Sequence, residues 1–120
     1  MKRIPEIVLS FRLLEARAEQ FVLEFAGREL AELDLWKEYG RDRELGAGVV
    51  DVKGFYPETP EDVAKRIRRV LTVCKADKLS VNPDCGFGWS PRYICNQKIR
   101  ALAAGAALLH AELMGRTLPA

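Results

Sequence analysis

Residues 81–91 read Val-Asn-Pro-Asp-Cys-Gly-Phe-Gly-Trp-Ser-Pro and place a carboxylate, a thiol and two glycines between a strand-like and a helix-like segment. The alternating residues 79–81 predict a short strand, and the Ser-Pro pair is typical of a helix start. Asp84 and Cys85 therefore fall at the carboxyl end of the predicted strand. In α/β sheets this end faces the ligand, so we expect any chemistry of the chain here.

A strand and a helix are also predicted near the amino end of the chain. Residues 20–25 form a near-continuous apolar run, as expected of a strand that is covered on both faces, and Glu24 lies near its end. Apolar residues at three-residue steps, Trp36 among them, then predict a helix over 28–39, with Trp36 in the core. Gly40 is placed to terminate this helix.

The middle of the chain repeats the pattern. Residues 45–52 lead from small residues into a β-branched run, with Asp51 and Lys53 at its end. Thr59 and Pro60 predict a helix start, because threonine caps helices well and proline suits their first turn. The expected buried stripe of this helix is Val63, Ile67, Val70, Leu71 and Cys74. The basic run on its other face is expected to be solvated.

A long helix is predicted from about Pro91 to Met114, and a leading helix after Pro5. The apolar side of the long helix is expected to comprise Ile94, Ile99, Leu102, Ala106, Leu109 and Leu113. Ile7, Phe11 and Leu14 fall on one face of the leading helix.

Three strand-helix units in succession predict an α/β fold with a parallel sheet, either a small open sheet or part of a (β/α)8 barrel of the TIM type. A whole barrel needs about 250 residues, whereas this chain has 120 and shows no internal domain boundary, so residues 1–120 are expected to form a single partial barrel domain. Open sheet edges leave backbone groups unpaired. We therefore expect self-association or a second polypeptide that completes the barrel.

Composition excludes several classes of protein. The net charge is +2, with basic residues spread among acidic ones, which argues against nucleic acid as a partner. No run of about 18 uncharged apolar residues indicates a membrane span. Three cysteines without a Cys-x-x-Cys pair suit a reducing compartment, so we expect a cytoplasmic protein.

Four segments together resemble the C-terminal catalytic domain of cobalamin-independent methionine synthase. They are Phe-Val-Leu-Glu-Phe-Ala at 21–26, Gly-Val-Val-Asp-Val-Lys at 48–53, Glu-Thr-Pro-Glu-Asp-Val at 58–63 and Asn-Pro-Asp-Cys-Gly at 82–86. The resemblance covers nearly the whole chain in order and implies strands six to eight of a β/α barrel. It also implies zinc-dependent transfer of a methyl group from a donor to homocysteine or a related thiol.

Carried over residue by residue, the resemblance implies that Glu24 and Cys85 are zinc ligands. The family's other two ligands form a His-x-Cys pair, which does not occur in this sequence. The one histidine, His110, is expected to be a surface or core residue of the last helix. Lys53 stands where many members have a histidine thought to donate a proton. We expect Lys53 to pair with Asp51 or with a substrate carboxylate, and both residues are candidate catalytic groups.

Purely structural interpretations of the same residues also stay open. Without the resemblance, Cys85 is more often a small packed thiol, and Cys74 and Cys95 are expected to pack in helices. Trp89 either lines a substrate pocket or covers the adjacent helix, and the glycines at 86 and 88 are explained by a sharp turn. Two function classes therefore remain: part of a methyltransferase, and a non-catalytic remnant or assembly module of such a barrel.

Overall fold

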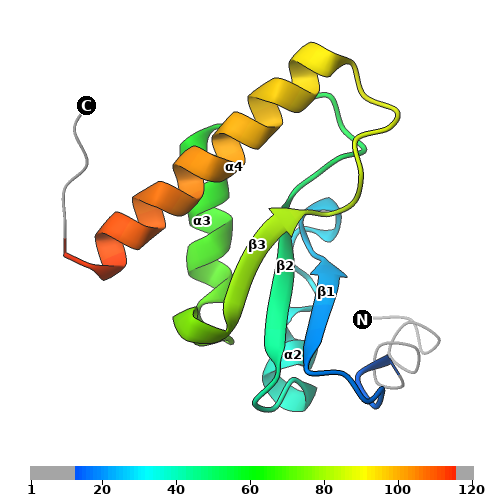
Figure 1. Cartoon of the computed structure of the whole chain (residues 1–120), viewed down its shortest axis with the longest axis vertical. Coiled ribbons are helices and arrows are strands. Elements are labelled where there is room, and N and C mark those ends of the chain that lie inside the picture. The colour runs from blue at the N-terminus through cyan, green and yellow to red at the C-terminus, as the bar shows by residue number, and fades with distance from the viewer. Residues whose placement is uncertain (1–12, 116–120) are drawn as a thin grey trace.

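The computed structural model describes residues 13–115. Three parallel strands form one sheet in the order β1-β2-β3, and Figure 1 shows their arrows pointing the same way. The strands are β1 (Gln20–Glu24), β2 (Glu44–Val50) and β3 (Leu79–Pro83); the helices are α2 (Leu33–Tyr39), α3 (Pro60–Val70) and α4 (Arg92–Leu113), with short 3-10 turns η1 (Ala26–Arg28) and η2 (Ala76–Lys78). The predicted α/β fold with three β-α units is confirmed. The predicted leading helix lies outside the described residues, apart from its last core position, Leu14, which is buried.

The two faces of the sheet differ. Phe21 and Leu45 share a row and are buried, and the Phe21 ring meets Trp36 of α2 edge-on at 6.2 Å. Because side chains alternate along a strand, Val22 faces the opposite side, where it is 65% exposed. The prediction that β1 is covered on both faces is therefore wrong for the described residues. Ser80, in the same row across the sheet, is also exposed.

The predicted helix over 28–39 is shorter than expected. Glu29 and Leu30 adopt positive φ angles of 54° and 63°, which break the helical path between η1 and α2. Leu30 is nevertheless buried, so this turn places an apolar side chain in the core. The end at Gly40 is confirmed; a Cβ there would lie 2.5 Å from the Trp36 ring, so the close approach of the indole requires glycine.

Helix α3 begins as the sequence predicts. The Thr59 hydroxyl accepts a hydrogen bond from the Asp62 backbone N–H at 3.1 Å, and Asp62 accepts one from the Thr59 N–H at 2.9 Å. This reciprocal pair is a capping box. Of the expected stripe, Val63, Ile67, Val70 and Cys74 are buried and Leu71 is partly buried.

Helix α4 buries four of the six residues of the expected stripe at least in part, including Leu102 and Ala106. Ile94 and Leu109 are buried, but Ile99 and Leu113 are 49% and 58% exposed. Lys98, a charged residue, takes a buried position instead. Gly105 lies where α4 approaches α3, since a Cβ there would be 2.6 Å from the side chain of Val63. In the part of the chain that the structure describes, no helix has the length and hydropathy to cross a membrane.

Candidate functional site

The carboxyl ends of the three strands bring the sequence-predicted residues to one edge of the sheet. Glu24 is the last residue of β1, Asp51 follows β2, and Cys85 lies two residues beyond the end of β3. Figure 1 shows the loops after β2 and β3 running together toward the start of α4. A hydrogen bond from the Ser90 hydroxyl to the Val52 carbonyl, at 3.3 Å, joins these loops.

Lys53 contacts Glu24 and not Asp51 through its side chain. Its ammonium lies 4.0 Å from the Glu24 carboxylate, and the two side chains are 79% and 45% exposed. Such an exposed pair contributes little to stability, so both charges remain available to a ligand. Asp51 instead accepts a hydrogen bond from the backbone N–H of Lys53 at 2.9 Å, which corrects the expected side-chain pairing of these two residues.

Glu24 and Cys85 supply two donor types that suit zinc. The Cys85 thiol is free and exposed, and Glu24 is an exposed carboxylate on the strand at the other side of β2. Thiolate and carboxylate are both zinc ligands, but zinc sites use three or four protein ligands. Among residues 13–115, no group of three or more histidine, cysteine, aspartate or glutamate side chains could hold a metal ion. The donor chemistry therefore fits part of a zinc site.

Asp84 connects the ends of β1 and β3, a role that sequence reasoning missed. Its carboxylate accepts hydrogen bonds from the backbone N–H groups of Phe25, Ala26 and Gly27 at 3.0, 3.1 and 2.6 Å. Burial raises the pKa of Asp84, and the nearby Glu24 charge adds to the rise, although the three N–H groups act against it. The sequence places Asp84 at a strand end but does not show its partners, which lie more than 50 residues away.

A buried ion pair fixes the loop that carries Asp51 and Lys53. The Lys98 ammonium donates to Glu58 at 2.6 Å and to the carbonyls of Asp51 and Tyr56 at 2.8 and 2.7 Å. Glu58 accepts further hydrogen bonds from the Asp51 N–H at 2.7 Å and from Arg66 at 2.8 Å. Both backbone groups of Asp51 are therefore held by one ion pair, whose two side chains are each 1% exposed.

Sequence reasoning missed Lys98 and the role of Glu58. Burial would raise the pKa of Glu58, but the hydrogen bonds from Lys98, Arg66 and the Asp51 N–H outweigh it and hold the pKa below its ordinary value. Arg66 belongs to the basic run expected to be solvated, and its contact with Glu58 is an exception to that prediction. The sequence did carry one indication of the role of Lys98. Strict helical spacing places position 98 in the buried stripe of α4, where a charged side chain needs a partner.

The remaining candidates lie apart from these contacts. Trp89 is 99% exposed, so it neither lines a pocket nor covers a helix among the described residues. Cys74 is buried and Cys95 is half-buried with its sulfur 3.5 Å from the Ser90 carbonyl, in agreement with packing roles. His110 is exposed on α4.

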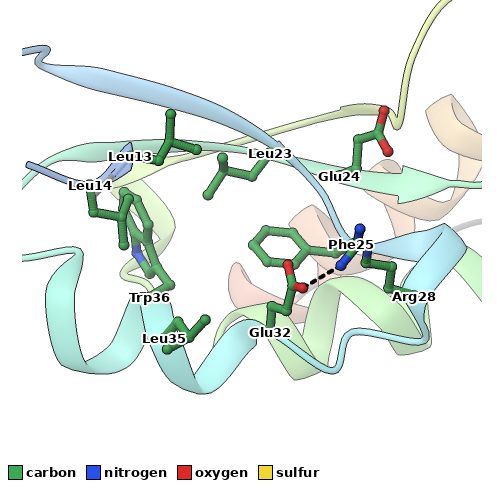
Figure 2. Close-up of a pocket in the computed structure, with 9 residues that line it drawn as sticks. All are labelled: Leu13, Leu14, Leu23, Glu24, Phe25, Arg28, Glu32, Leu35 and Trp36. Atoms are coloured by element: carbon green, nitrogen blue, oxygen red, sulfur yellow. Dashed lines mark hydrogen bonds and ion pairs between the residues drawn. The ribbon is translucent and has the colours of Figure 1, made fainter. Parts of the chain in front are cut away.

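A cavity of about 180 Å³ lies between β1 and α2. Its walls are mainly apolar, with Leu23, Leu35 and Trp36 among them, and Arg28 pairs with Glu32 at 2.6 Å on one side (Figure 2). Figure 2 shows the Glu24 carboxylate pointing away from these apolar walls. The cavity is therefore a gap beside β1 and not the place where the candidate ligands meet.

A parallel sheet with charged and thiol side chains after its strands is the arrangement found at the active face of β/α-barrel enzymes. The chain belongs to the family described as "Cobalamin-independent synthase, Catalytic domain", whose model matches residues 4–107. The resemblance seen in the sequence is thereby confirmed.

Similar proteins agree with this family. Methionine synthase of Saccharolobus islandicus (strain Y.G.57.14 / Yellowstone #1) is 40% identical over 101 residues, which are 84% of this chain and 30% of that protein. Methionine synthase of Thermococcus kodakarensis is 39% identical over 82% of this chain and 29% of its own length. The solved B12-independent methionine synthase of Shewanella sp. W3-18-1, in complex with selenomethionine, has a TM-score of 0.82 and 26% identity, covering 92% of this chain and 32% of its own.

The fold is therefore part of a TIM-type barrel with three parallel strands. The chain spans about 30% of the length of the curated relatives that it matches.

Proposed function

We propose that this chain is the C-terminal part of a catalytic domain that transfers a methyl group to the sulfur of homocysteine or a related thiol. Glu24 and Cys85 serve as two of the zinc ligands, and Asp51 and Lys53 act on the substrate. The observation that carries the proposal is that a carboxylate, a cation and a free thiol follow three parallel strands at one edge of the sheet. Family membership supplies the class of reaction.

The reaction needs a thiolate at neutral pH. Zinc, when bound, supplies this by lowering the pKa of the thiol and holding its sulfur. During transfer the sulfur–carbon bond forms while the bond between the methyl group and its donor breaks, and the donor keeps that electron pair. The thiol proton is released to the solvent beforehand. Asp51, held by its two backbone contacts to the ion pair, presents a fixed negative charge to the substrate beside the exposed cation of Lys53.

The test of this function is methyl transfer by a reconstituted complex. This chain is mixed with a polypeptide that supplies the remaining barrel strands and a His-x-Cys pair. Methionine formed from homocysteine is then measured with a methylated folate and, separately, with a methyl-corrinoid as the methyl donor. We expect activity in the mixture and none in either component. An inactive but fully assembled, zinc-loaded complex would contradict the proposal and favour the non-catalytic assembly module.

In that complex, replacement of Lys53 by methionine is expected to raise KM about tenfold, equivalent to about 1.4 kcal/mol, with a smaller fall in kcat. The reason is that the exposed Lys53 ammonium, only 4.0 Å from Glu24, is placed to bind a substrate carboxylate. Lys65→Met, at an exposed position of α3, is the matched control. A fall in kcat with KM unchanged would indicate proton transfer by Lys53 and contradict a binding role.

Partners that complete the barrel are also part of the proposal. In the described sheet, β1 and β3 are each paired on one side alone. An apolar cavity lies beside each of them: one near Leu23 and Leu35, the other of about 190 Å³ near Leu79, Val81 and Leu113. Further strands and helices of the barrel, from a second copy or another polypeptide, would pair these edges and fill these gaps.

Light scattering is expected to show that the purified chain alone forms species above its monomer mass of 13.5 kDa. The reason is the exposed backbone edges together with the apolar cavities beside them. Addition of a polypeptide carrying the missing strands should replace these species with a defined complex. A monodisperse monomer with a sharp unfolding transition would show that the chain closes its core alone.

A further inference from the structure

The Asp84 carboxylate holds the backbone that directly follows Glu24. One of its oxygens accepts hydrogen bonds from Phe25 and Ala26, and the other accepts one from Gly27 at 2.6 Å. Phe25 is the residue after Glu24, and Asp84 is the residue before Cys85. A hydrogen-bonded connection between the segments that carry the two candidate ligands therefore runs through this carboxylate.

The glycine at the middle strand makes room for this connection. Gly48 of β2 is paired with Glu24 on one side and Asn82 on the other. A Cβ at Gly48 would lie 2.9 Å from the Asp84 Cα and would overlap its carboxylate. Asp84 thus passes over the end of β2 to reach the turn after β1, which ties the ends of all three strands together.

We propose that Asp84 is a positioning residue that holds Glu24 and Cys85 at a separation at which both bind one metal ion. The inference rests on the proposed function, because it takes Glu24 and Cys85 as ligands. Groups that orient metal ligands without touching the metal commonly change affinity by about 10-fold to 100-fold when they are removed. Here the hydrogen bonds of Asp84 hold the backbone that follows Glu24. Their loss therefore frees the end of β1 and not the Glu24 side chain alone.

A double-mutant cycle on the full chain tests the proposal. The chain is titrated with Cd²⁺, whose bond to a thiolate gives an ultraviolet charge-transfer band, and Cys85→Ser provides the background from the other thiols. Glu24→Gln is expected to weaken Cd²⁺ binding about tenfold when Asp84 is present. In the Asp84→Asn background the same change is expected to have less than about a twofold effect, because Glu24 no longer shares the ion with Cys85.

Two further variants make the result specific. Asp77→Asn, an exposed carboxylate in η2 at the other end of β3, should behave like the parent chain. Gly48→Ala crowds both the carboxylate and the backbone Cα of Asp84, so it moves this residue without removing its charge. If Asp84→Asn does not fold, Gly48→Ala should give the result expected of it. Thermal unfolding confirms which variants are folded.

The outcomes distinguish a failure of the inference about Asp84 from a failure of the proposed function on which it rests. If Glu24→Gln weakens Cd²⁺ binding equally in both backgrounds, Glu24 and Cys85 share the ion and Asp84 does not position them. If Glu24→Gln has no effect on the parent chain, the shared-ligand assignment itself is wrong, and with it the inference.

Discussion

Replacement of Lys98 by methionine is expected to lower the free energy of unfolding by about 3–5 kcal/mol. The ammonium is 1% exposed and donates to Glu58 and to the carbonyls of Asp51 and Tyr56. Methionine fills a similar volume but donates no hydrogen bond, so a buried carboxylate loses its closest cation and two carbonyls lose a donor. Removing one partner of a buried ion pair is costly because the other charge stays buried. Domains of this size are stable by only about 5–15 kcal/mol.

Chemical denaturation of the parent and variant measures this difference. Lys65→Met, on the exposed face of α3, is the matched control and should change stability by no more than about 0.5 kcal/mol. A loss below about 1 kcal/mol for Lys98→Met would show that the remaining contact of Glu58 with Arg66 suffices, and that the Asp51 loop does not depend on Lys98.

The ion pair of Glu58 and Lys98 also makes the free energy of unfolding depend on pH. The pKa of Glu58 in the folded chain is lowered from its ordinary value of 4.5. Its stabilising contribution is therefore fully present above about pH 4.5 and is lost as the pH falls through the lowered folded-state pKa. Removal of the Lys98 ammonium raises the folded-state pKa of Glu58, so the stability gap between parent and Lys98→Met should narrow on acidification. A gap that stays constant from pH 7 to about pH 3 would contradict this account.

Local signals in the sequence predicted the elements but not all of their extents. Thr59 and Pro60 specify a helix start through neighbouring backbone groups, so α3 begins where expected. The helix over 28–39 was predicted too long, because burial of Leu30 in a left-handed turn depends on the core and not on local propensity. The buried stripe of α4 was predicted to include Ile99, because this side chain is apolar. The structure instead buries the neighbouring Lys98.

The placement of the candidate residues at one edge of the sheet was predictable for a topological reason, but the contacts that support them were not. Glu24, Asp51 and Cys85 each follow a strand, and parallel strands end at one edge of a sheet. Asp84 reaches a turn 57 residues away, and Lys98 pairs with Glu58 across 40 residues. These contacts depend on how β1 and α4 are placed in three dimensions, which spacing along the chain does not show.

The second large effect concerns the thiol of Cys85. In a complex with a polypeptide that contributes a His-x-Cys pair, Cys85→Ser is expected to weaken zinc binding strongly. A serine hydroxyl is not a zinc ligand of this kind, and three remaining donors without the thiolate make a much weaker site. Cys74 is buried and Cys95 is half-buried among carbonyls, so Cys74→Ser and Cys95→Ser are the matched controls and should leave the zinc content unchanged.

Protection from alkylation should accompany zinc binding. The exposed thiol of Cys85 should react readily in the chain alone and slowly in the zinc-loaded complex, with protons released on metal uptake. Fast alkylation of Cys85 in a fully loaded complex would show that the metal is bound elsewhere.

The central claim is that Glu24 and Cys85 form part of a zinc site that a second polypeptide completes, and elemental analysis of zinc tests it most directly. The chain alone should retain little zinc, because two ligands hold the ion weakly, and the mixture should hold about one zinc per complex. The Cys85→Ser mixture should retain much less zinc than the parent mixture after dialysis against a weak chelator. Equal zinc in the Cys85→Ser and parent mixtures would contradict the account.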